Sequence, residues 1–285
     1  MIAIPRTSLL CADCQCPALA ARALALSLRQ CAYERTQLFT DARDVPELDP
    51  RIEIVAIPKI SSAVEYSRFV LKDLLRFAET DFVQIVQWDG YVTNGAGWRD
   101  AFLDYDYIGA RWWFRENGRN VGNGGFSLRS RRLLEALQDP EIKATDSEDN
   151  AICLDNRELL ERRYGIRIAP AAVADAYAFE GTRPSGREFG FHRLFNFPHF
   201  HDEAGLAELM AMVPDSIFCS EVTLTLVRNL LALGRNAEAL RYASKAMDRP
   251  ALPPVLRGDY ERLVKAEIKR AHRRERRVRE QNRAV

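Results

Sequence analysis

The sequence predicts an α/β fold with a mostly parallel central sheet, followed by a small α-helical segment. Three observations support this fold class. Strand-like and helix-like patterns alternate through the first half of the 285 residues, as in a parallel sheet with helices on its faces. The hydrophobic content of 47% is that of an ordinary globular core. Beyond residue 200 the pattern is helical.

Four apolar or alternating runs in the first half predict strands, and two longer runs predict helices between them. The strand candidates are residues 7–13, 33–41, 51–58 and 81–88. Residues 17–30 contain many good helix formers, and apolar residues recur over residues 62–80 at the spacing of an amphipathic helix. Residues 81–88 are almost continuously apolar or β-prone, as expected of a strand covered on both faces. This order is typical of a nucleotide-binding fold.

From Asp89 the pattern loosens into turns and short strands that are rich in glycine. Helices are predicted at residues 130–139 and 147–164, and a further strand at residues 165–170. We expect three regions, namely an α/β domain at residues 1–200, a helical segment at residues 201–264, and a basic helical or disordered tail at residues 265–285.

The helical segment resembles a single tetratricopeptide unit over residues 221–252. It has a first helix, a turn at Leu233 to Arg235, Ala239 and Ala243 on a second helix, and Pro250 at the exit. One unit cannot bury its own apolar face. We therefore expect it to pack on the α/β domain or on another copy of the chain, which leaves a homodimer through these helices open.

The charge is placed unevenly along the chain. Residues 265–285 hold nine Lys or Arg and three Glu, a net +6, so the whole-chain charge of +1 leaves −5 for residues 1–264. A basic end of this kind is commonly a solvated tail. Alternatively, this basic end makes a peripheral, salt-sensitive contact with an anionic membrane surface. We expect no nucleic-acid partner.

The cysteines and the apolar stretches predict a cytoplasmic protein. Six cysteines are too few and too unevenly spaced for a disulfide framework, so reduced thiols are expected. Three of them cluster in residues 11–16, where incidental thiols are favoured over a zinc site because no second cysteine pair follows. No stretch reaches the roughly 18 uninterrupted apolar residues that a membrane-spanning helix needs.

Four short segments carry the chemistry. They are Gln87-Trp88-Asp89-Gly90, Val121 to Ser130, Ser147-Glu148-Asp149-Asn150, and Phe189-Gly190-Phe191-His192. Together they resemble the GT-A-type glycosyltransferases, and "QWDGYV", "DYIGA", "VGNGGFSLRS" and "FGFH" look most like a bacterial family of glycosyltransferase-like domains. The resemblance covers roughly residues 50–198. It implies a Rossmann-like GT-A fold and an enzyme that transfers a sugar, with UDP-sugar as the first guess for the donor, in polysaccharide or glycoconjugate synthesis.

The resemblance assigns Asp89 and His192 as ligands of Mn²⁺ or Mg²⁺. A divalent cation neutralises the charge that develops on a diphosphate leaving group, and it prefers hard oxygen ligands. Gln87 departs from the family pattern, since it stands where the first Asp of an Asp-x-Asp motif is expected. Alone, Asp89-Gly90 is equally well explained as a strand-ending turn. A lone His is also more often structural than a ligand.

Further residues are assigned to the donor and to the chemical step. Gln87, Trp88, Asn123, Gly124, Gly125 and Ser127 are the candidate donor-binding residues. Glycines let backbone approach a sugar closely, although the same string also suits a hairpin. The resemblance makes Asp149 the general base of an inverting transfer, with Glu148 as its substitute. The competing interpretation is that these acids only begin a helix.

Two other function classes remain open. A nucleotidyltransferase-like enzyme shares the sheet and the metal requirement, but residues 11–20 have neither Gly nor Lys for a phosphate loop. A non-catalytic scaffold with a degenerate glycosyltransferase fold is kept open by Gln87. The acceptor, whether glycan, lipid-linked or protein, is not indicated by the sequence.

Overall fold

The computed structural model describes residues 1–42, 45–46, 48–115, 118–145 and 147–283, with side chains described up to residue 270 and at Arg273. The chain divides into two compact units, Met1–Arg193 and Leu194–Val285. We expected the first region to extend to residue 200, whereas the division lies at Arg193.

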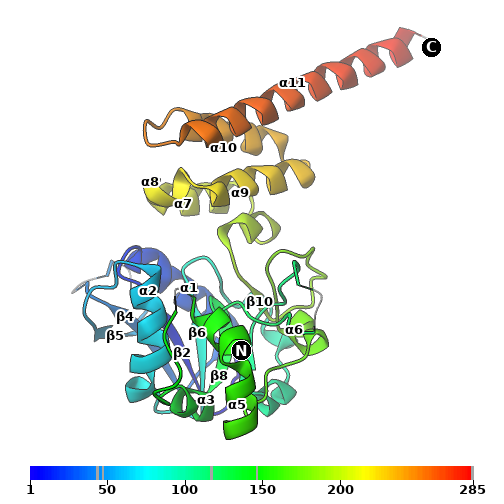
Figure 1. Ribbon diagram of the computed structural model, residues 1–285. Helices are drawn as coiled ribbons and strands as arrows, with labels where there is room; N and C mark the ends of the chain where they lie inside the picture. Colours follow the sequence, from blue (N-terminus) through cyan, green and yellow to red (C-terminus); the bar gives the residue numbers. More distant parts are fainter. Residues whose placement is uncertain (43–44, 47, 116–117, 146, 284–285) are drawn as a thin grey trace. The chain divides into compact units, whose positions relative to one another are not determined.

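A six-stranded sheet forms the centre of the first unit (Figure 1). Its strands, in spatial order, are β5 (Glu53–Ala56), β4 (Arg35–Thr40), β2 (Thr7–Ala12), β6 (Phe82–Val86), β8 (Phe126–Ser130) and β7 (Tyr107–Ile108). The first four run parallel, and β8 is antiparallel to both of its neighbours. The predicted α/β class, with a mostly parallel Rossmann-like sheet, is confirmed.

Each face of the sheet is covered by its own apolar cluster. On β2, Leu9 belongs to the cluster that contains Leu24 of helix α1 (Pro17–Gln30), whereas the adjacent Leu10 belongs to the other cluster. Successive side chains of a strand point to opposite faces, so a strand buried on both faces must be apolar at every position. This explains why the central strands read as continuous apolar runs.

The two long predicted helices are helical but not single α-helices. Residues 62–80 form α2 (Ala63–Arg68), a π-helical turn η1 (Phe69–Asp73) and a 3₁₀ turn η2 (Leu74–Phe77). Residues 147–164 likewise form α4 (Glu148–Asn150), π-turn η5 (Ala151–Asp155) and α5 (Arg157–Tyr164). π-Turns often accompany functional sites, and α2 and α4 both reach the cavity described below.

The strand predicted at residues 165–170 is wrong in extent. Gly165 is the left-handed C-cap of α5, with φ of 63°, and Pro170 is the N-cap of α6 (Ala171–Tyr177). Within the segment only Ile168 forms a β-bridge, with Tyr107. The two caps leave too few residues for a longer strand. The helix predicted at residues 130–139 is α3 (Arg131–Ala136), whose first turn is capped by the Ser130 hydroxyl.

Short elements complete the first unit. They are β1 (Ile2–Ala3) paired with β3 (Cys31–Ala32), the 3₁₀ turns η3 (Gly95–Gly97) and η4 (Asp100–Asp104), and β9 (Ala178–Phe179) paired in parallel with β10 (Gly190–Phe191). The β9–β10 pair positions the site, because Glu180 follows β9 directly and His192 follows β10.

The second unit is helical, as predicted. It comprises η6 (Leu194–His199), α7 (Glu203–Met212), α8 (Asp215–Phe218), α9 (Glu221–Ala232), α10 (Asn236–Met247) and α11 (Pro254–Arg283). Helices α9 and α10 flank a turn with Gly234 at φ of 76°, and Ala239 and Ala243 are buried. These features agree with the expected helix pair, and its identity as a tetratricopeptide unit stays a prediction.

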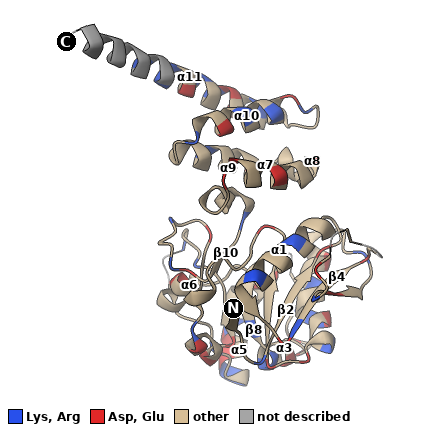
Figure 2. Cartoon of the chain, turned by 180° about the vertical axis from the view of Figure 1, so that it is seen from behind, with Lys and Arg blue, Asp and Glu red and all other residues tan. Residues whose placement is uncertain are grey.

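The region expected to be a basic helical or disordered tail is helical up to Arg283. Residues 265–283 continue α11 without a break, and Glu267 is only 4% exposed, with Asn236 Nδ2 donating a hydrogen bond to its carboxylate at 2.9 Å. The earlier, described part of this helix carries both basic and acidic side chains (Figure 2). A search of the described helices finds none whose length and apolar character would suit a membrane crossing.

Candidate active site

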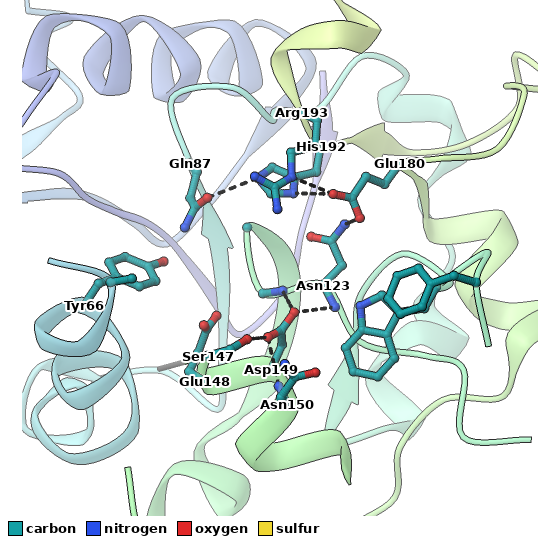
Figure 3. A pocket seen from close by; sticks show the side chains of 15 residues that line it. Tyr66, Gln87, Asn123, Ser147, Glu148, Asp149, Asn150, Glu180, His192 and Arg193 are labelled. Carbon is teal, nitrogen blue, oxygen red and sulfur yellow. Dashed lines mark hydrogen bonds and ion pairs between the residues drawn. The ribbon is translucent and has the colours of Figure 1, made fainter. Parts of the chain in front are cut away.

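A polar cavity of about 390 Å³ opens in the first unit (Figure 3). Most of its lining residues come from three places: the end of β6, the glycine-rich loop before β8, and the start of α4. Further residues come from the segments that follow β9 and β10. The polar residues lining it are Tyr66, Gln87, Asn123, Ser147, Glu148, Asp149, Asn150, Glu180, His192 and Arg193. The topology thus gathers segments up to 127 positions apart in the sequence.

Gln87, Asp89 and His192 converge at one edge of this cavity. His192 Nε2 lies 3.1 Å from Gln87 Oε1 and 3.2 Å from Asp89 Oδ1. The side chains of His192 and Asp89 are only 5% and 8% exposed. Burial alone would lower the pKa of His192, but the charge and hydrogen bond of Asp89, with a further contribution from the nearby Glu180 carboxylate, raise it to about 9. The two carboxylates thus favour the positively charged form of the imidazole.

These three side chains fit a small divalent metal ion. Neighbouring ligands of an octahedral ion bound at about 2.1 Å lie about 3 Å apart, close to the two separations around His192 Nε2. A Cβ atom at position 125 would overlap the His192 ring and crowd the Gln87 amide oxygen, so only glycine lets the loop pass here. In the part of the chain that is described, no three His, Cys, Asp or Glu side chains form a complete metal cluster. Remaining positions of an ion here would have to be filled by substrate oxygen or water.

Glu180 lies beside His192, Arg193 and Asn123 in the cavity (Figure 3), and the sequence analysis did not identify it. Its Oε2 accepts a hydrogen bond from Asn123 Nδ2 at 2.5 Å, and its Oε1 accepts one from Arg193 Nε at 2.7 Å. Oε1 also lies 3.7 Å from His192 Nδ1. Burial would raise the pKa of Glu180, but His192 and Arg193 lower it to about 2. The carboxylate is therefore ionised.

The carboxylate of Asp149 accepts hydrogen bonds from the glycine-rich loop and from its own segment. Its Oδ2 accepts backbone N–H groups of Asn123 at 3.1 Å and Gly124 at 3.3 Å. Its Oδ1 accepts the Asn150 N–H at 2.8 Å and the Ser147 hydroxyl. A carboxylate has about four acceptor positions, and these four donors fill them. Asp149 thereby holds the glycine-rich loop at the cavity wall.

Glu148 is held differently, by a buried ion pair. Its Oε1 accepts a hydrogen bond from Arg129 Nη2 at 2.9 Å, and the Arg129 side chain is fully buried on β8. Arg129 Nε also donates to Ser127 Oγ at 3.1 Å. Among the described residues, none donates a hydrogen bond to Glu148 Oε2. Glu148 therefore brings one oxygen to the cavity while the other is anchored in the core.

A second cavity of about 260 Å³ shares Ala63, Tyr66 and Gln87 with the first. It lies at the carboxyl end of β2 and is lined by Ala12, Asp13, Cys14, Gln15, Cys16, Ile60, Ser62 and Trp88 in addition. Asp13 accepts the backbone N–H groups of Gln15 and Cys16, which shapes the turn after the strand. Burial raises the pKa of Cys16 to about 11, so this thiol stays protonated at neutral pH.

The structure brings together most of the predicted site residues. Gln87, Asn123, Gly124, Gly125, Glu148, Asp149 and His192 line the first cavity, and Asp89 contacts His192 beside it. Trp88 instead lines the second cavity. Ser127 is fully buried and donates its hydroxyl hydrogen bond to the Gly124 carbonyl oxygen at 2.9 Å, so it supports the loop from below.

Glu180, Arg193 and Tyr66 were missed. The sequence carries no motif around Glu180, because β9 and β10 are only two residues each and their pairing is not a local property. Arg193 directly follows His192 and has a left-handed backbone, with φ of 82°. The sequence does not indicate this conformation, because the residue is not a glycine. Tyr66 belongs to a helix whose periodicity indicates only a core-facing stripe.

Comparisons with known proteins give the following similarities. A family model described as a protein of unknown function, DUF5672, matches residues 51–192, just under half of the chain. No curated protein matches. An active-site mutant of LgtC is similar at 11% identity and a TM-score of 0.42, over 74% of this chain and 98% of that chain. The galactosyltransferase LgtC in complex with donor and acceptor sugar analogues is similar at 10% identity and a TM-score of 0.39, with the same coverage. The matched family region contains every residue lining the first cavity except Arg193.

Proposed function

We propose that this protein is a metal-dependent glycosyltransferase of the GT-A type, which moves a sugar from a nucleotide-sugar donor to an acceptor hydroxyl. The observation that carries the proposal is the convergence of Gln87, Asp89 and His192 at the edge of a carboxylate-lined cavity. The cavity lies where open α/β sheets bind ligands, beyond the carboxyl ends of parallel strands. The motifs "QWDGYV" and "VGNGGFSLRS" support the same assignment.

We assign each of the two cavities to a different part of the nucleotide-sugar donor. The second cavity, with Trp88 and the turn around Asp13, suits the nucleoside, because it offers an aromatic ring and backbone groups at the end of β2. Arg193 and the metal position are placed for the diphosphate, and the first cavity is placed for the sugar. UDP is our first choice of nucleotide, on the resemblance of the motifs alone.

The chemical step follows from these positions. An acceptor hydroxyl oxygen forms a bond to the anomeric carbon while the bond from that carbon to the diphosphate oxygen breaks, and the hydroxyl proton passes to a carboxylate. Mn²⁺ or Mg²⁺, held by Asp89, His192 and the Gln87 amide, would supply neutralisation of the leaving diphosphate. Direct displacement of this kind inverts the anomeric configuration.

Glu148 suits the role of proton acceptor better than Asp149. All four acceptor positions of Asp149 are used by Asn123, Gly124, Ser147 and Asn150, whereas Glu148 keeps one oxygen towards the cavity. The initial assignment of Asp149 as base and Glu148 as substitute is therefore reversed in this proposal. Asp149 acts by holding the loop that lines the sugar position.

Thermal unfolding in the presence of nucleotide and metal tests the binding half of this proposal. A ligand that binds only the native state raises its apparent stability. We expect UDP with Mn²⁺ to raise the melting temperature more than either alone, and a panel of sugar nucleotides to show metal-dependent donor hydrolysis. A chain that responds to no nucleotide with metal, and hydrolyses no donor, would be the non-catalytic scaffold instead.

A further inference from the structure

We propose that Glu180 is a positioning residue that ties the metal ligand His192 to the loop that holds the donor sugar. The inference rests on the glycosyltransferase function proposed above and adds a residue that no motif indicates. Figure 3 shows Glu180 between His192 and Arg193 on one side and Asn123 on the other. The side chain is 16% exposed, so it is largely shielded from water.

The contacts of Glu180 reach both functional parts of the cavity. Oε2 accepts the hydrogen bond from Asn123, whose backbone N–H is in turn held by Asp149. Oε1 accepts the hydrogen bond from Arg193 and faces the His192 ring nitrogen that points away from Asp89. A histidine that binds metal through one ring nitrogen is commonly oriented by a carboxylate at the other. The Glu180 carboxylate lies on that side of the His192 ring, with Oε1 3.7 Å from Nδ1.

The backbone at two of these partners supports the same conclusion. Asn123 and Arg193 have φ of 64° and 82°, a left-handed conformation that costs a non-glycine residue free energy. Such conformations persist when surrounding contacts hold them, and they concentrate at functional sites. Both side chains donate to the same carboxylate. Glu180 thus holds two strained residues, one on each side of the cavity.

The expected consequence is that metal and donor binding both depend on the hydrogen bonds and ion pairs of Glu180. If Glu180 loses its charge, the His192 ring and the Asn123 loop each lose an anchor. Arg193 is then released from its ion pair. Loss of a carboxylate behind a metal-binding histidine commonly weakens metal affinity roughly 10- to 100-fold.

Isothermal titration of Mn²⁺ and UDP into the full-length protein tests this role in the Glu180→Gln variant. We expect Mn²⁺ binding in the presence of UDP to weaken about tenfold or more. Glu188→Gln is the matched control, because Glu188 is a similarly buried carboxylate nearby that accepts backbone N–H groups of Ser185 and Gly186 outside the cavity. The control should bind as the wild type does.

The Asn123→Gly variant separates backbone strain from the side-chain bond. Glycine adopts the left-handed conformation readily but cannot donate to Glu180. We expect this variant to keep its fold and to weaken UDP-sugar binding as Glu180→Gln does. The double variant should lose less than the sum of the two single losses, because either substitution alone removes the hydrogen bond between Asn123 and Glu180.

The outcomes separate this inference from the proposed function. If the wild type binds UDP with Mn²⁺ and Glu180→Gln binds equally well, the positioning role is wrong while the function stands. Equal weakening in Glu188→Gln would show that any lost buried carboxylate has this effect, which also overturns the inference. A wild type that binds neither ligand would instead end the proposed function.

Discussion

The metal site proposed above has one carboxylate, Asp89, because Gln87 stands where an Asp-x-Asp motif has its first acid. Asp89 supplies the negative charge of the proposed site. The Gln87 amide oxygen, 3.1 Å from His192 Nε2, stands where the other carboxylate would be. A neutral amide ligand is a weaker partner for a divalent cation than a carboxylate is. Affinity for the ion should therefore depend heavily on the oxygens of the substrate diphosphate.

The first prediction concerns Asp89. Asp89→Asn should lower turnover by two orders of magnitude or more, about 3 kcal/mol of lost transition-state stabilisation, because the charged metal ligand is removed. Steady-state transfer assays measure the loss, and circular dichroism checks that the fold survives. Chelation by EDTA should abolish wild-type activity. Full activity in either experiment would exclude a metal at this position.

The second prediction separates the two neighbouring acids. Glu148→Gln should abolish transfer while UDP and Mn²⁺ binding stays near normal, because a base acts in the chemical step. Asp149→Asn should instead weaken donor binding, since its amide N–H₂ would face the backbone N–H donors of Asn123 and Gly124. Titration calorimetry combined with kcat measurements distinguishes these results. The reverse pattern would restore Asp149 as the base.

At the scale of elements, the segment before the glycine-rich loop presents aromatic rings to solvent. Trp113 and Phe114 are 63% and 60% exposed, and their rings meet edge to face at 5.7 Å. The backbone N–H of Trp112 donates a hydrogen bond to the Asn120 carbonyl oxygen at 2.8 Å and stabilises this segment. A Cβ at Gly181 would overlap the Trp113 ring, so glycine gives this ring its place. Phe114 also lines the first cavity.

The third prediction follows from this aromatic pair. The rings lie beside the cavity and present faces that suit the C–H side of an acceptor sugar. Trp113→Ala combined with Phe114→Ala should raise the KM for acceptor several-fold, while metal-dependent donor hydrolysis continues at the wild-type rate. Unchanged acceptor kinetics would show that the pair belongs to another contact of the protein.

At the scale of the whole molecule, a net positive charge is concentrated in residues 265–285, whereas residues 1–264 carry a net negative charge. The positive charge expected of residues 265–285 lies on the later part of α11. Packing through Glu267 anchors this helix within the second unit. A cut at residue 264 would remove that anchor, so a clean test must preserve it.

The fourth prediction is a membrane test on a shortened chain. Full-length protein should sediment with anionic liposomes at low salt, because each Lys or Arg near an anionic bilayer contributes about 1 kcal/mol of attraction. Truncation after Arg270 should remove this binding, and so should about 0.5 M salt, which screens such charges within a few ångströms. Donor hydrolysis by the shortened chain should stay unchanged. Equal sedimentation of both forms at low salt would show that residues 271–285 do not bind membranes.

The sequence by itself determined the class of the fold and the order of the strands β2, β4, β5 and β6 with the helical segments between them. Apolar periodicity reports which faces of a segment are buried, and this is a local property of the chain. It also identified the segments that converge on the site. Gln87, Asn123 and His192 were all named from short motifs, and all three line one cavity.

The tertiary structure alone decided which of these side chains face the cavity and which support it. Ser127 and Arg129 lie on β8, whose antiparallel place in the sheet buries both, although the motif presented Ser127 as a donor contact. Glu180 became part of the site only because β9 and β10 pair and bring it to Asn123, 57 positions away. Contacts between distant segments depend on how the whole core packs, and no local pattern encodes them.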